Sequence, residues 1–207
     1  GFDIIPSNTI TNNGKVTITT RPDASIPTIS NYSPNYSIVN NQGAELEINR
    51  TNINSAYAIN NKGTLTLSSS NIVSSNTSIN NTGTINADNI SLIADTYPVY
   101  NDGGEISATN NSSIQNGTIY NKSGTITMTD SIATNAASTK TSFITNYGAL
   151  ELNGSTASQI ITSTGLGYHI WTRTIYNAGS LSTNDNSSIL QSIDVSTYCY
   201  YSLFPNH

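Results

Sequence analysis

A five-residue pattern that recurs along the chain constrains its fold more than any other feature of the sequence. Each copy reads Ile or Val, any residue, Asn, any residue and usually Gly, as in Ile59-Asn60-Asn61-Lys62-Gly63. The shared asparagines are Asn12, Asn41, Asn61, Asn81, Asn101, Asn121, Asn146 and Asn177. From position 41 to position 121 the spacing is a constant 20 residues. A fixed period of this length is typical of solenoids and other repeat proteins.

Two further apolar elements follow each shared asparagine and indicate short strands. Directly after the glycine, apolar residues alternate with polar ones, as in Leu65-Thr66-Leu67. Alternation with a period of two is typical of a half-buried strand. A third element contributes an isoleucine, such as Ile53 or Ile72. No helical period persists, so each unit is predicted to contain three short strands.

Three short strands per unit, without a crossover helix, predict an all-β parallel β-helix whose coils pair with the coils above and below. We predict one domain, residues 1–207, with an N-terminal cap over 1–8 and about eight or nine coils over 9–190. Residues 191–207 are predicted to form a C-terminal cap or the start of a further segment. Coils of 20 residues with uneven insertions favour the right-handed form, because left-handed β-helices prefer strict six-residue steps.

The pattern also predicts how the interior is filled. The first aliphatic residue of each copy is expected to stack in one column, namely Ile10, Val39, Ile59, Ile79, Val99, Ile119, Ile144 and Ile175. Parity then points the shared asparagines inward, where each amide can bond its own turn and the amide one coil away. The following glycine is expected to supply a positive φ at the turn.

The longer spacings of 29, 25 and 31 residues between other shared asparagines predict insertions. They fall around residues 21–35, 133–142 and 159–173. All three are expected between the third strand of one coil and the first strand of the next, so that they emerge along one edge of the rod. Loops on one face of a solenoid often carry binding sites.

The stretch Ala58-Ile59-Asn60-Asn61-Lys62-Gly63-Thr64-Leu65-Thr66-Leu67 resembles the repeats of secreted bacterial right-handed parallel β-helix proteins. These include large cell-surface adhesins and autotransporter-type passenger domains, with a fold related to that of pectate lyases. The resemblance spans roughly residues 8–190 and implies an extracellular or cell-surface location and an adhesive role. It is specific for the fold and not for the function, because one scaffold hosts adhesins, lyases and phage spikes.

Composition excludes several classes of partner. The formal net charge is −5 and only 7 residues are Lys or Arg, so we expect no nucleic-acid partner. No apolar run approaches the roughly 20 residues of a transmembrane helix, and no membrane insertion of this segment is expected. The chain begins without a signal peptide, as expected for a mature form or a fragment. Although only 9% of residues are charged, the regularly placed Ile and Leu argue against a disordered tract.

The residues that carry enzymatic chemistry in related folds are dispersed. Glu47 and Glu151 fall in one outward column but several coils apart, too far for a glycosidase pair. The only imidazoles are His169, within an insertion, and His207 at the end of the sequence. We therefore expect no catalytic residue, no metal site and no cofactor. A polysaccharide lyase or hydrolase is the alternative that the resemblance leaves open.

Aromatic residues indicate a binding edge instead. The residue between the aliphatic residue and the shared asparagine points outward, and it is a tyrosine in three of the later coils. The insertion over 165–171 adds a second aromatic group between glycines. The candidate ligand-binding residues are Tyr97, Tyr100, Tyr120, Tyr147, Tyr168, His169, Trp171, Arg173 and Tyr176. Exposed aromatic rings beside Asn and Ser suit a glycan or a host or cell-surface protein as ligand.

Three other interpretations remain. Cross-strand aromatic stacking can simply stabilise a sheet. A column of threonines, including Thr64, Thr84 and Thr125, has the character of an ice-binding face, although charged residues interrupt it. A structural stalk without a ligand, as part of a larger surface protein, is the third.

Overall fold

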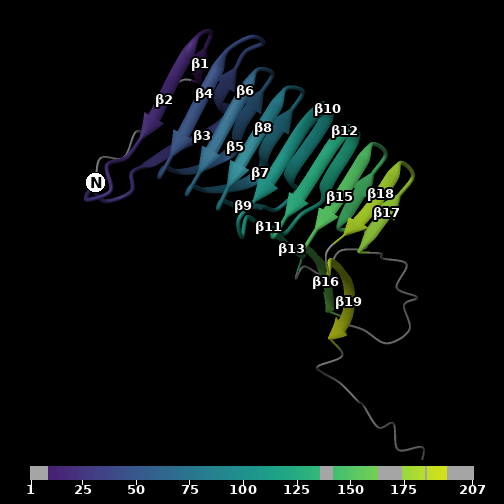
Figure 1. Cartoon of the computed structure of the whole chain (residues 1–207). Coiled ribbons are helices and arrows are strands. Elements are labelled where there is room, and N and C mark those ends of the chain that lie inside the picture. The colour runs from purple at the N-terminus through teal and green to yellow at the C-terminus, as the bar shows by residue number, and fades with distance from the viewer. Residues whose placement is uncertain (1–8, 136–141, 163–173, 185, 195–207) are drawn as a thin grey trace, which may run out of the picture.

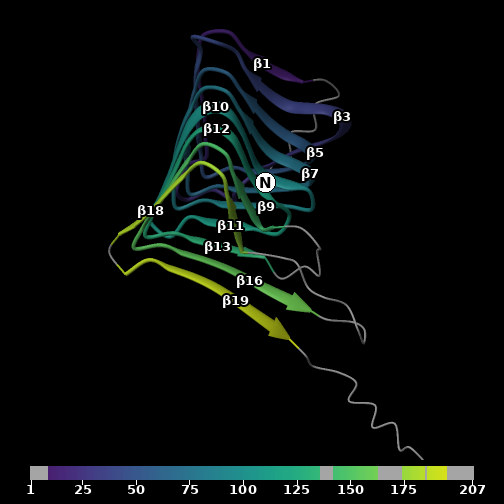
Figure 2. The same ribbon diagram turned by 90° about the vertical axis from the view of Figure 1, so that its right-hand side faces the viewer.

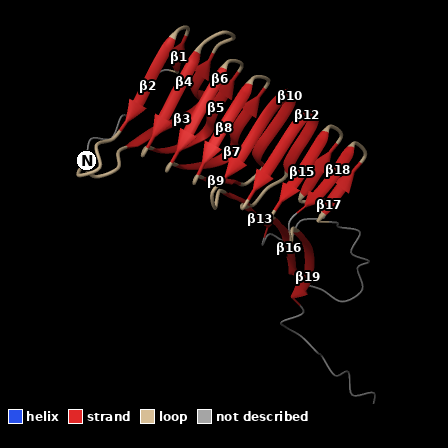
Figure 3. Cartoon of the chain, viewed as in Figure 1, coloured by secondary structure: helices blue, strands red, loops and turns tan. Residues whose placement is uncertain are grey.

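The computed structural model describes residues 9–135, 142–162, 174–184 and 186–194. Within them the chain forms 19 strands and no helix (Figure 3). All strand pairs are parallel, and each strand pairs with its counterparts in the neighbouring coils. The strands stack along a curved rod (Figure 1), and the view turned by 90° shows the three sides of the coil (Figure 2). The predicted parallel β-helix is confirmed.

Each coil has three sides, which the strands define in sequence order. The first side contains β1 (Ile10–Asn12), the ends of β3 (Thr28–Asn40), β5 (Asn52–Asn61) and β7 (Asn71–Asn81), the beginnings of β10 (Tyr97–Thr109) and β12 (Ile119–Thr129), and β14 (Ile144–Asn146) and β17 (Ile175–Asn177). The second side contains β2 (Lys15–Thr19), β4 (Glu45–Asn49), β6 (Thr64–Ser68), β8 (Thr84–Asp88), the ends of β10 and β12, β15 (Ala149–Asn153) and β18 (Ser180–Asn184). The third side contains the beginnings of β3, β5 and β7, then β9 (Ser91–Ala94), β11 (Ser113–Gln115), β13 (Ile132–Asn135), β16 (Thr156–Thr162) and β19 (Ser188–Asp194).

Aliphatic columns fill the interior, as the alternation predicts. On the first side Ile10, Ile38, Ile59, Ile79, Val99, Ile119, Ile144 and Ile175 follow one another in register. The predicted member Val39 is wrong, because it points outward and Ile38 takes its place. About six turns enclose a buried core, slightly fewer than predicted, since the outermost coils leave Val16 and Leu181 exposed.

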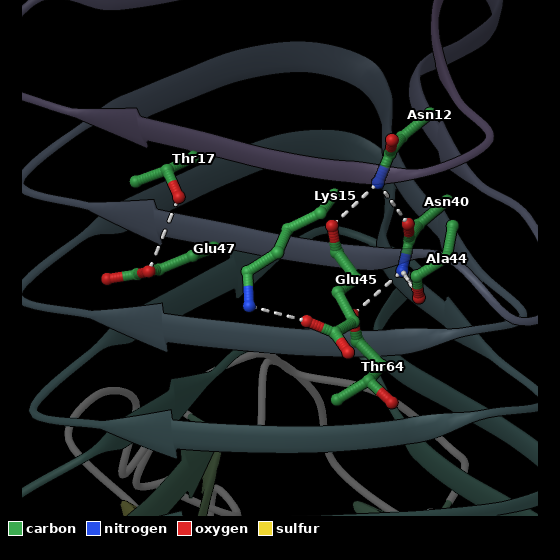
Figure 4. A network of polar contacts seen from close by, with 8 residues as sticks. All are labelled: Asn12, Lys15, Thr17, Asn40, Ala44, Glu45, Glu47 and Thr64. Atoms are coloured by element: carbon green, nitrogen blue, oxygen red, sulfur yellow. Dashed lines mark hydrogen bonds and ion pairs between the residues drawn. The ribbon is translucent and has the colours of Figure 1, made fainter.

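A continuous ladder of amides runs along the corner between the first and second sides, which we call the asparagine corner. All of its members are buried except Asn177 in the last coil, which is exposed. Each Nδ2 donates to Oδ1 of the next coil's asparagine, from Asn12 to Asn40 at 2.8 Å and from Asn101 to Asn121 at 2.9 Å. The same Nδ2 also donates to backbone carbonyls, as Asn40 does to Thr64 (Figure 4). The remaining ladder members are Asn61, Asn81, Asn146 and Asn177.

One predicted ladder residue is wrong. Asn40 is fully buried and in register with Asn61, whereas Asn41 lies in the turn. The Nδ2 of Asn41 donates instead to Oδ1 of Asn13 on the exposed surface. The turn of this coil is longer by two residues, since Asn40 and Glu45 are in register with Asn61 and Thr64 of the next coil. The five-residue pattern is therefore displaced by one place relative to the stack.

The recurring glycines of the asparagine corner have the predicted positive φ in only some of the coils. Positive φ angles occur only where the turn carries an extra residue, at Gly43, Gly103 and Gly124. Close approach explains the other corner glycines except Gly14 of the first coil, where an added Cβ would meet nothing within 4 Å. A Cβ on Gly83 would lie 2.1 Å from the carbonyl oxygen of Gly63 in the preceding coil. Stacked glycines therefore let the turns of neighbouring coils touch.

A second polar ladder, which sequence reasoning missed, lies at the corner between the second and third sides. A residue with positive φ, such as Arg50 or Asp130, turns the chain there. A buried hydroxyl follows it, and its Oγ accepts from the backbone of the preceding coil, as in Ser131 N–H to Ser155 Oγ at 3.0 Å. We call this the serine corner. Ile90 replaces the hydroxyl residue in one coil and is still buried.

The insertions are placed as predicted in two of three cases. Residues between Asn135 and Ile144, and those between β16 and Ile175, follow a third strand and precede a first strand. The first insertion is wrong in part. Most of it, residues 20–27, lies at the serine corner between β2 and β3, and only a shorter part precedes Tyr36.

Candidate binding surface

Five tyrosines form a continuous aromatic row on the outside of the first side. This tyrosine ladder consists of Tyr97, Tyr100, Tyr120, Tyr147 and Tyr176. Tyr100 and Tyr120 occupy the same register position on β10 and β12, each next to a buried ladder asparagine. Alternation along the strand therefore sends the ring out and the amide in. The structure brings together five of the predicted ligand-binding residues.

The geometry of the rings differs along the row. Tyr100 and Tyr120 stack with ring centroids 5.2 Å apart and an interplanar angle of 11°. Tyr97 meets Tyr100 edge-on at 5.6 Å, with an angle of 75°. The stacked pair covers its own facing surfaces, so it presents mainly ring edges and hydroxyls to solvent. A flat ligand that packs against an aromatic face must therefore bind elsewhere on the row.

Tyr147 supplies that face, although it lies outside the register of the other rings. The register position after Tyr120 is Thr145, a small residue, and it is followed by Tyr176. Tyr147, in the turn after Asn146, fills the gap over Thr145 and contacts Tyr120 at 6.0 Å and Tyr176 at 5.9 Å. Its ring is tilted by 55° to Tyr120, and 48% of the residue is exposed. Tyr176 is 37% exposed.

Polar groups flank the row on both sides. Below Tyr100 the outward position is occupied by Asn80 and Asn60, whose amides bond each other at 3.2 Å. Beside Tyr100 and Tyr120, Lys122 Nζ lies 2.7 Å from Asp102 Oδ2. The hydrogen bond from Lys122 lowers the pKa of the Asp102 carboxyl, and the same bond raises the pKa of Lys122. The aromatic row therefore has polar side chains next to it that can form hydrogen bonds with the hydroxyls of a ligand.

The other predicted aromatic group cannot be compared with this row. Tyr168, His169, Trp171 and Arg173 lie outside the described residues. Phe143, which lies near the same segment, is fully buried and belongs to the core. A separate tyrosine pair, Tyr36 and Tyr57, meets edge-on at 5.5 Å in the early coils, and burial raises the pKa of Tyr36.

Among the described residues, the outer surface of the second side is polar and has no cluster of aromatic rings. Its outward columns mix Thr64, Thr84 and Thr125 with charged residues such as Glu45 and Glu105. Lys15 pairs with Glu45 at 2.9 Å (Figure 4), and this hydrogen bond raises the pKa of Lys15. The threonine rows are therefore interrupted in the folded protein as they are in the sequence.

The two carboxylates of the predicted outward column are too far apart to act as a pair. Glu47 and Glu151 share a column, and the four intervening strands separate them by about 24 Å at the usual strand spacing. No group of three or more His, Cys, Asp or Glu that could hold a metal ion occurs among the described residues. A recess of about 350 Å³ opens at the last coil and is lined by Thr174, Ile175, Asn177, Leu181, Ile189 and Gln191.

No protein-family model, no curated protein and no solved structure matches the chain. Within the part of the chain that the structure describes, no helix is long and apolar enough to cross a membrane.

Proposed function

We propose that the chain is an extracellular binding module that presents the tyrosine ladder to a glycan, as part of a microbial surface protein. The observation that carries the proposal is the uneven use of one outward position. It holds Thr11, Val39, Asn60 and Asn80 in the early coils. In the later coils it holds Tyr100, Tyr120 and Tyr176, with Thr145 between the last two. Because the fold accepts small and polar residues there, the gathered tyrosines are better explained by a ligand than by folding.

The chemistry of the row favours a sugar. Pyranose rings present C–H faces that pack on an exposed aromatic ring, and hydroxyls that bond amides and charged groups. Tyr147 and Tyr176 supply exposed rings, and the Asp102–Lys122 pair and the Asn60–Asn80 pair supply polar neighbours. The rings lie on or beside strands held in register, so that little order has to be gained on binding.

A glycan array, followed by titration of the best ligand, tests the proposal. We expect Tyr147→Ala to weaken binding by about tenfold or more, since one well-packed ring contributes on the order of 1.4 kcal/mol. Tyr57→Ala is the matched control, because Tyr57 pairs with Tyr36 and Thr77 separates it from Tyr97 in the same outward column. Unchanged affinity in both Tyr147→Ala and Tyr176→Ala would place the site elsewhere. Binding only to protein matrices would replace the glycan by a protein ligand.

A further inference from the structure

The stacked pair at the centre of the tyrosine ladder has a geometry that none of the other described ring pairs shares. Tyr100 and Tyr120 lie 11° from parallel, whereas the remaining pairs are inclined by 55° to 75°. Both residues are partly exposed, and their backbones are held opposite each other by the pairing of β10 with β12. The two phenols are therefore fixed side by side and open to solvent.

We propose that Tyr100 and Tyr120 are a site of oxidative cross-linking, at which a peroxide-driven one-electron oxidant such as a haem peroxidase forms dityrosine. This inference does not depend on the glycan-binding function. It assigns to the protein a covalent modification that joins two neighbouring coils.

The reaction balances with hydrogen peroxide as oxidant. Each phenol loses one electron and its hydroxyl proton and becomes a phenoxyl radical. The two radicals form a carbon–carbon bond between positions ortho to oxygen, and the hydrogens on those carbons move to the oxygens and restore both hydroxyls. Peroxide takes up the two electrons and two protons and becomes two molecules of water. The protein loses two hydrogen atoms.

Ring orientation explains why this pair and not another should react. The unpaired electron of a phenoxyl radical occupies π orbitals that extend from the ring faces. In the stacked pair these orbitals point toward one another, so the ortho carbons can bond as the rings close. In the edge-on pairs, such as Tyr36 with Tyr57 at 65°, the face of one ring meets the edge of the other. Those pairs need a larger rotation before a bond can form.

Ordered neighbours make the pair accessible to an oxidant that cannot itself reach between the rings. Tyr147, the more exposed ring, lies 6.0 Å from Tyr120. A radical formed on Tyr147 can take an electron and a proton from Tyr120, which regenerates the phenol of Tyr147. The exposed end of the ladder then serves as an entry point, and the stacked pair is where two radicals meet.

The test uses the full chain at low concentration with horseradish-type peroxidase and hydrogen peroxide. Dityrosine fluorescence, intact mass and peptide mapping are measured together. We expect a monomeric product lighter by two hydrogen atoms, whose cross-linked peptides contain Tyr100 and Tyr120. Tyr120→Phe keeps the ring but lacks the hydroxyl and should abolish this product. Tyr57→Phe, the matched control, should leave it unchanged.

Three outcomes would overturn the proposal. The first is a cross-link that maps to any other pair in the monomer. The second is dityrosine found only between chains. The third is oxidation without a Tyr100–Tyr120 product while the peroxidase converts free tyrosine in the same tube. Circular dichroism of Tyr120→Phe shows whether that variant keeps the fold, and Tyr100→Phe provides a second, independent loss of the reacting hydroxyl.

Discussion

Tyr100 and Asn101 are neighbours on β10, yet they belong to two stacks with different demands. Asn101 is fully buried and its Nδ2 donates to Gly104, Asn121 and Ser123. Tyr100 points outward, and its ring contacts those of Tyr97 and Tyr120. The inner stack keeps asparagine in every described coil, whereas the outer one accepts Thr, Val, Asn or Tyr. The residues of the inner stack are therefore determined by folding, and those of the outer stack by what the surface binds.

The largest expected effect comes from breaking the inner stack. Asn101→Leu keeps the branched shape of the side chain but removes the acceptor of one hydrogen bond from Asn81. It also leaves the Oδ1 of Asn121 and two carbonyls without the donor that Asn101 supplies. We expect a loss of about 4 kcal/mol in the free energy of unfolding, because each buried group without a partner costs about 1–3 kcal/mol. Urea denaturation followed by circular dichroism measures the change.

Asn80→Leu is the control for that variant. Asn80 precedes a ladder residue but faces outward, and its side-chain Nδ2 donates to Oδ1 of Asn60. A cost below about 1 kcal/mol is expected, as for other cross-strand surface pairs. Equal losses in Asn80→Leu and Asn101→Leu would remove the distinction between the two stacks.

Substitution of glycines at the asparagine corner tests how closely neighbouring coils approach each other. In Gly83→Ala the added Cβ meets backbone atoms of Lys62 and Gly63, which cannot move without separating two coils. We expect a loss of about 3 kcal/mol, at the upper end for overpacking. Gly14→Ala is matched by position and has nothing within 4 Å of the added atom. Its stability should be unchanged or slightly raised, and a loss as large as that of Gly83→Ala would contradict the close-approach explanation.

The serine corner should be more tolerant than the asparagine corner. Ser131→Ala removes the hydroxyl that donates to the carbonyl of Thr129. We expect the free energy of unfolding to fall by about 1–2 kcal/mol. Ile90 already occupies the corresponding position in another coil without a hydroxyl. A melting experiment on Ser131→Ala and Asn101→Leu side by side would rank the corners, and a larger loss in Ser131→Ala would reverse the order that we expect.

The smallest effect belongs to the exposed Asp102–Lys122 pair. Because Lys122 lowers the folded-state pKa of Asp102, the contribution to stability is present above the ordinary carboxyl pKa of about 3.9 and is lost as the pH falls through the folded value. The raised pKa of Lys122 places the alkaline loss above about 10.4. Between these pH limits, the free energy of unfolding of Lys122→Gln should be slightly lower than that of the parent at low salt. At high salt the two values should converge. A difference that persists in acid would exclude the ion pair as its cause.

The fold could be predicted because its signal repeats. An amide and an aliphatic residue recur once per coil, and only a stack of coils satisfies such a row of buried amides. The serine corner could not be predicted, because Ser is abundant in the sequence and is equally common in exposed turns. Tyr147 was assigned to the aromatic edge by its position in the sequence, but its place between Tyr120 and Tyr176 depends on the small Thr145 beneath it.

The sequence by itself determined the architecture, the inward amides and the outward tyrosines, since these follow from a period of 20 residues and an alternation of two. The tertiary structure alone decided between Asn40 and Asn41, because both amides bond a neighbouring coil but only that of Asn40 does so in the buried interior. It also decided that most corner glycines avoid a clash between coils and do not provide a positive φ. Local patterns carry no information on such contacts, which exist only once the coils are stacked.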